Sequence, residues 1–223
     1  MAQIIPEGWQ ALGVTGAAQR EIETLAQLAA VLPDAYTVYH GVHWTRVNQG
    51  HAFVGEIDFV IVNPAGNLLL IEQKSGFLSE TPEGLAKQYD KNEKLVQAQM
   101  ARSLDSLRKR LYQYCTAERP TLDSLLYCPD YLVKQPGSAG IDPERIVDAS
   151  KREHLARIIR SLLPEDTSPS KLADEVHRFL RDELRLVADV ATWLGRRARS
   201  TRASRGAWPN GHAASNASRS GCA

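Results

Sequence analysis

Two acidic residues and a lysine are set into a stretch of the chain that is otherwise strongly apolar. Asp58 stands directly before the run Phe59-Val-Ile-Val62, and Glu72 and Lys74 follow the run Leu68-Leu-Leu-Ile71. A carboxylate taken out of water costs free energy unless it is paired or binds a cation. Two acids close together raise that cost because they repel each other. A divalent cation such as Mg²⁺, which takes one or two carboxylates and keeps water in its other positions, would satisfy this arrangement.

The two apolar runs read as neighbouring strands, and residues 63–67 between them (Asn-Pro-Ala-Gly-Asn) fit a three-residue hairpin loop. The proline suits the first central position of a type I turn. The glycine suits the left-handed residue that follows such a turn and makes a bulge. The loop therefore predicts that Asn63 faces Asn67.

That register brings the charged residues together. With Asn63 opposite Asn67, Asp58 lies opposite Glu72, and Glu56 lies opposite Lys74. Because side chains alternate along a strand, these four charged residues share one face, with opposite Cβ atoms about 4.5–5.5 Å apart. The residues predicted to turn the other way are Ile57, Phe59, Ile71 and Gln73.

The spacing of these residues resembles the Asp…Glu-x-Lys motif of the PD-(D/E)XK nuclease superfamily. The longer strings Gly55-Glu-Ile-Asp58 and Ile71-Glu-Gln-Lys74 are similar to its nuclease-related (NERD) domain branch, whose members are often fused to a DNA helicase. The resemblance implies a nuclease that uses Mg²⁺ (or Mn²⁺) to hydrolyse DNA, in DNA repair or processing. From the residues alone, the alternative is a surface ion-pair ladder in which Lys74 and solvent satisfy the two acids.

The resemblance also implies roles for single residues. Asp58 and Glu72 would hold the metal with help from the Gln73 carbonyl, and Lys74 would orient the attacking water or stabilise the transition state. A glutamine at the head of the second core helix would point back at the site. Gln99 fits that position better than Gln97.

An acid on the first core helix often helps to hold metal or water in this superfamily. Glu21 lies toward the predicted packed face and is the candidate, although Gln19 could occupy the position instead. The alternative role for Glu21 is local pairing at the edge of the core. His40 and His43 are predicted to lie on opposite strand faces and to serve in packing.

The periodicity of apolar residues predicts an α/β fold in the order helix, three strands, helix, strand, with extra C-terminal helices. This order agrees with the restriction-endonuclease-like αβββαβ core that the resemblance implies. The expected elements are a helix from Thr15 to Leu32, strands at Tyr36–Val47 and in the hairpin, a loop at Phe77–Tyr89, a helix at Asn92–Tyr114, a strand at Leu122–Tyr127, and helices at Lys151–Leu163 and Lys171–Val190. The predicted domains are an N-terminal arm (1–14), the nuclease-related domain (15–130), a helical extension (131–194) and a disordered basic tail (195–223).

The charge of the chain is unevenly distributed. The sequence has 27 basic and 26 acidic residues, but no acid follows Asp189, whereas six arginines do; without those six, 21 basic residues face 26 acidic ones. A basic surface therefore does not carry the prediction of DNA as partner; the metal site does. A second function class follows: a non-catalytic nucleic-acid-binding or helicase-associated module, acting with a helicase motor in cis or in trans.

Three cysteines without paired spacing indicate a reducing compartment, and we expect a cytoplasmic protein. The N-terminus lacks the features of a signal peptide, and no apolar run approaches the length of a membrane span, so no membrane partner is predicted.

Overall fold

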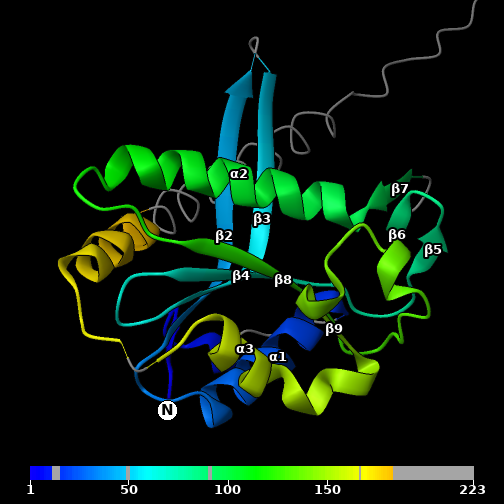
Figure 1. Cartoon of the computed structure of the whole chain (residues 1–223), viewed down its shortest axis with the longest axis horizontal. Helices are drawn as coiled ribbons and strands as arrows, with labels where there is room; N and C mark the ends of the chain where they lie inside the picture. The colour runs from blue at the N-terminus through cyan, green and yellow to red at the C-terminus, as the bar shows by residue number, and fades with distance from the viewer. Residues whose placement is uncertain (12–15, 49–50, 90–91, 166, 183–223) are drawn as a thin grey trace, which may run out of the picture. The chain divides into compact units, whose positions relative to one another are not determined.

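A mixed six-stranded sheet forms the centre of this computed structural model, which describes residues 1–11, 16–48, 51–89, 92–165 and 167–182 (Figure 1). The strand order is β1-β2-β3-β4-β8-β9. Strands β2, β3 and β4 pair antiparallel, whereas β1, β8 and β9 join their neighbours in parallel. The strands of this sheet are β1 (Gln3–Ile5), β2 (Thr37–Asn48), β3 (His51–Val62), β4 (Leu68–Gln73), β8 (Leu122–Cys128) and β9 (Ile146–Asp148).

Helices cover both faces of the sheet (Figure 1). Helices α1 (Ala17–Val31) and α3 (Leu155–Leu162) pack on one face, around a core that contains Phe59 and Ile71. Helix α2 (Val96–Tyr114) and a helix over residues 171–182 pack on the other face, around Val60 and Leu70. The order α1, β2, β3, β4, α2, β8 confirms the predicted αβββαβ core, and the fold is consistent with a restriction-endonuclease-like architecture.

The hairpin between β3 and β4 has the predicted register. The Asn63 amide donates to the Asn67 carbonyl at 3.2 Å, and the ladder pairs Val62 with Leu68 and Phe59 with Ile71. Gly66 has a φ of 84°, as the loop chemistry predicts. A Cβ at Gly66 would lie 2.7 Å from the backbone nitrogen of Ala173, so tertiary packing demands glycine as well.

In β2 and its partner β3, the alternation of side chains between the two faces of the sheet breaks beside Asp58. His40 stacks on Phe59 on the α1 side, whereas Val42 and Ile57 pack into the core under α2. Between them lies Gly41, whose φ of 66° is a left-handed conformation that interrupts the alternation of side chains. The prediction that Ile57 shares a face with Phe59 is therefore wrong, whereas Phe59 and Ile71 do face the α1 core together.

Several predicted elements differ from the observed ones. The predicted arm contains β1, which pairs with β2. A separate three-stranded sheet forms from β5 (Ser79–Thr81), β6 (Gly84–Tyr89) and β7 (Asn92–Leu95). Strands β5 and β6 lie where a loop was expected, and β7 replaces the start of the helix expected from Asn92, so that α2 begins at Val96. The segment predicted as a helix from Lys151 begins as a 3₁₀ turn before α3. The described ranges also contain the 3₁₀ helices η1 (Trp9–Ala11), η2 (Pro136–Ser138), η3 (Pro143–Arg145) and η4 (Ala149–His154).

The helices beyond residue 130 contribute side chains to both cores. Leu155 and Ile159 of α3 lie in the core under α1, and Val176 lies in the core under α2. The expected N-cap at Thr15, the end of the last predicted helix and the predicted tail at 195–223 lie outside the described residues. No helix in the described ranges is long and apolar enough to span a membrane.

Candidate active site

Glu72 lies at the centre of the candidate site, near the end of β4 and buried at 4% exposure. Its Oε1 atom accepts from the Lys74 ammonium at 2.5 Å, and Lys74 is itself only 6% exposed. The side-chain amide nitrogen of Gln99 (Nε2), in the first turns of α2, donates to the same oxygen at 2.5 Å. Two donors therefore fix the orientation of this carboxylate. The competing candidate Gln97 instead donates to the Glu83 carbonyl at 2.9 Å and lies against Gly84.

Asp58 lies on β3 at the point where the strand changes faces. Its Oδ2 atom accepts from the backbone amide of Gln73 at 2.6 Å, and this bond holds Asp58 to the end of β4. Burial raises the pKa of Asp58 well above its ordinary value, and the nearby Glu72 charge raises it further, against the opposing effect of Lys74. The structure therefore brings Asp58, Glu72 and Lys74 into one electrostatic cluster.

Burial also raises the pKa of Glu72, although the Lys74 charge and hydrogen bond oppose that shift. The second oxygen of Glu72, Oε2, is buried without a hydrogen-bond partner among the described residues, and so is Oε1 of Gln73. Buried oxygens normally have a partner, so an orphaned carboxylate oxygen beside a second carboxyl group with a raised pKa is suited to binding a cation. The donor set fits a hard ion such as Mg²⁺, which binds one or two carboxylates and keeps several waters. Within the described residues, no three acid, histidine or cysteine side chains cluster closely enough to form a complete protein cage for a metal.

Glu21 lies on α1 at the edge of this cluster. It accepts from Nε2 of His40 at 3.0 Å, and its charge raises the pKa of Asp58 and of Glu72. Local pairing, one of the two roles considered for Glu21, is therefore present, and a role in metal or water binding stays a prediction.

The histidine contacts were not predicted. His43 lies 3.4 Å from Glu56, the residue opposite it on β3. Because the alternation slips at Gly41 between them, His40 and His43 fall on the same side of β2, and the prediction of opposite faces is wrong. Gly41, which lies between the two histidines, permits a left-handed conformation, but its presence in the sequence does not reveal it.

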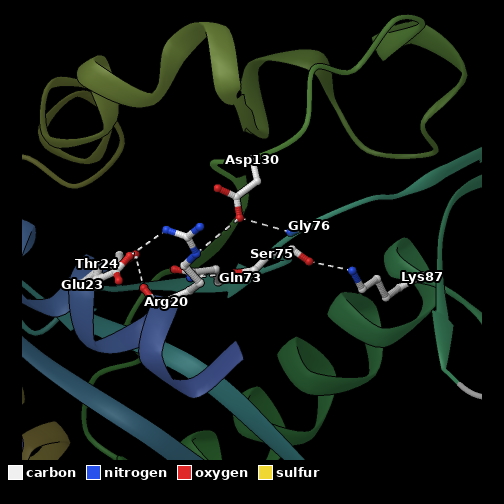
Figure 2. A network of polar contacts seen from close by, with 8 residues as sticks. All are labelled: Arg20, Glu23, Thr24, Gln73, Ser75, Gly76, Lys87 and Asp130. Atoms are coloured by element: carbon white, nitrogen blue, oxygen red, sulfur yellow. Dashed lines mark hydrogen bonds and ion pairs between the residues drawn. The ribbon is translucent and has the colours of Figure 1, made fainter. Parts of the chain in front are cut away.

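A second polar network ties down the segment that follows Lys74, and Figure 2 shows it. Lys87 of β6 donates to the Ser75 carbonyl at 2.6 Å and to the Phe77 carbonyl at 3.0 Å. Asp130, which follows β8, accepts from the Gly76 amide at 3.2 Å. No sequence pattern indicated Lys87, because it lies in a stretch predicted to be a loop.

The same network reaches α1. Arg20 lies 3.9 Å from the Asp130 carboxylate and pairs with Glu23 at 2.9 Å, and Thr24 donates to the Arg20 carbonyl (Figure 2). The start of α1 and the ends of β4 and β8 are thus joined by side chains beside the carboxylate cluster.

A comparison with protein families supports the resemblance noted in the sequence. The profile of the nuclease-related domain family matches residues 16–129, which are more than half of the chain and include every element of the αβββαβ core. Comparisons with curated proteins and with solved structures gave no match. The chain therefore belongs to the nuclease-related domain family.

Proposed function

We propose that this protein hydrolyses DNA phosphodiester bonds in a reaction that depends on Mg²⁺ or Mn²⁺, in DNA repair or processing. The observation that carries the proposal is the hydrogen bonding of the Glu72 carboxylate. One of its oxygens is held by Lys74 and Gln99, while the other is buried without a partner in the described part of the chain, next to Asp58. Such an arrangement is costly for stability and suited to binding a cation.

Asp58 and Glu72 would hold the ion. When bound, a divalent metal supplies an activated water and neutralises charge on the scissile phosphate. The ammonium of Lys74 is held by Glu72 and lies close enough to Asp58 to oppose part of the rise in the pKa of Asp58. It can therefore stabilise negative charge that develops on the phosphate. Gln99 holds the Glu72 carboxylate in one orientation, and the Gln73 amide does the same for Asp58.

The second candidate is a binding module that positions nucleic acid or a helicase motor without cutting. The excess of acidic residues over basic ones ahead of the arginine-rich end of the chain favours this candidate. The pairing of buried Lys74 with Glu72 favours the enzyme, because a binding surface gains nothing from burying both charges.

Purified protein incubated with linear, nicked, branched and single-stranded DNA distinguishes the two classes. Each substrate is tested with Mg²⁺, with Mn²⁺ and with chelator, and Asp58→Asn is assayed beside the wild type. We expect cleavage of at least one substrate that requires metal and is lost in the variant. DNA binding without cleavage under every condition would instead support the binding module.

A further inference from the structure

An aromatic ring stands exposed three residues beyond Lys74. Phe77 lies in the connection between β4 and β5, and 74% of its surface is open to solvent. Among the large apolar residues in the described ranges, Met1 alone is more exposed. Single exposed apolar residues are common on proteins, so exposure alone assigns no role to Phe77.

The backbone that presents this ring is held on both sides. Lys87 donates to the Ser75 carbonyl, and Asp130 accepts from the backbone amide of Gly76 (Figure 2). Lys87 also donates to the Phe77 carbonyl. Three consecutive residues are therefore fixed by side chains from two other parts of the chain. An exposed connection held in this way is pre-organised to present its side chain.

The ring itself is also oriented. Tyr131 meets Phe77 edge-on, with ring centroids 5.6 Å apart and planes at 88°. The Tyr131 hydroxyl donates to Glu80 at 2.8 Å, so the supporting ring is fixed in turn. A single perpendicular neighbour covers at most one flat face of Phe77, and the 74% exposure of this residue leaves the other face accessible.

Positive charge lies on the backbone segment that carries this ring. The Lys87 ammonium binds the Phe77 carbonyl, and burial together with the charge of Lys74 lowers the pKa of Lys87. The Lys74 and Lys87 ammonium groups are thus electrostatic neighbours, one paired with Glu72 and the other bound to the Phe77 carbonyl. Cations that follow a phosphate backbone, next to an aromatic face, are the combination by which proteins hold single-stranded nucleic acid.

We propose that Phe77 stacks on an unpaired nucleobase of the DNA strand whose phosphate occupies the Asp58–Glu72–Lys74 site. This inference rests on the proposed function and adds a substrate class: single strands, or duplex ends with unpaired bases. Within a duplex, neighbouring bases cover both faces of a base, so Phe77 has no face on which to stack. A protein partner fits less well, because one exposed ring is far smaller than the area of about 800 Å² per partner in a stable interface.

The test uses an oligothymidylate that carries a single 2-aminopurine, whose fluorescence falls when the base stacks on an aromatic ring. Binding is measured with Ca²⁺ in place of Mg²⁺, for the wild type and for Phe77→Ala, Phe77→Trp and Leu132→Ala. Leu132 is the matched control because it is an apolar residue with 55% exposure next to Tyr131. Thermal melting of each variant verifies that it is folded, and closed circular duplex DNA serves as the second ligand.

We expect Phe77→Ala to abolish the fluorescence change and to weaken binding of the single strand about 5- to 150-fold, the range for loss of one base–aromatic stack. Phe77→Trp should retain both properties, and Leu132→Ala should resemble the wild type. Binding to the circular duplex should change less than about twofold in any variant.

The inference is overturned if Phe77→Ala binds the single strand as the wild type does, or if it loses affinity for the circular duplex equally. Cleavage with Mg²⁺ is scored separately. Stacking without cleavage would reject the proposed function and leave Phe77 as a nucleobase contact. Cleavage by a wild type that shows no stacking would reject the role of Phe77 alone.

Discussion

Replacing Asp58 by Asn should stabilise the metal-free fold at neutral pH while it abolishes hydrolysis. The raised pKa of Asp58, caused first by burial and then by Glu72, means that the folded state disfavours the ionised carboxylate. Asparagine removes the charge, and its Oδ1 can still accept from the Gln73 amide, the bond that now measures 2.6 Å. Relief of a buried, poorly compensated charge is worth about 1–2 kcal/mol. For a domain of this size that corresponds to an increase in Tm of about 2–8 °C.

The pH dependence of this gain has a defined sign. Because the folded-state pKa of Asp58 lies above 3.8, the folded protein binds the Asp58 proton more tightly than the unfolded chain does. The wild type therefore loses stability as pH rises from near 3.8 through the folded pKa, and Asp58→Asn lacks that loss. The advantage of the variant should be complete above the folded-state pKa of Asp58 and should disappear as the pH approaches 3.8.

Denaturant unfolding in chelator, at neutral pH and at several acidic values, measures this difference. Glu118→Gln is the matched control because Glu118 is an exposed acid, and it should unfold as the wild type does at each pH. An Asp58→Asn protein that is no more stable than the wild type at neutral pH would show that the Asp58 charge is compensated in the metal-free fold, and it would refute the reasoning.

Three further substitutions test other contacts. Glu72→Gln should destabilise the fold by about 3–5 kcal/mol in denaturant unfolding, because it leaves the buried Lys74 ammonium without its carboxylate; unchanged stability would contradict this. Lys74→Ala should lose cleavage in a gel assay while it retains Mn²⁺ affinity, and lost affinity would give Lys74 a structural role instead. Gly66→Ala should lower stability by about 1–3 kcal/mol, because φ is 84° and the new Cβ would meet Ala173; an unchanged melting curve would refute that reading.

The hairpin could be predicted because its determinants are local. The loop of residues 63–67 contains the residues that its turn type requires, and the turn fixes the β3–β4 register from Val62–Leu68 to Phe59–Ile71. The positions of Glu72 and Lys74 at the end of β4 followed from that register. The contact of Gln99 with Glu72 followed from the family resemblance and not from the spacing of residues.

The remainder depends on contacts between distant segments. The change of face at Gly41 comes from one backbone conformation that the sequence pattern does not reveal, because glycine tolerates ordinary strand angles as well. The short strands β5, β6 and β7 carry too few apolar residues for a periodic signal. The contacts of Lys87 and Asp130 with the segment after Lys74 depend on that small sheet and on the end of β8, and no local pattern predicts them.

Titration of the protein with Mn²⁺ by calorimetry, in the absence of DNA, most directly tests whether Asp58 and Glu72 form a cation site or only a buried ion-pair cluster. We predict that the wild type and Glu118→Gln each bind the ion, and that Asp58→Asn binds it at least about tenfold more weakly. A wild type that takes up no Mn²⁺, or an Asp58→Asn protein that binds it as tightly as the wild type, would contradict the metal site and the proposed hydrolysis.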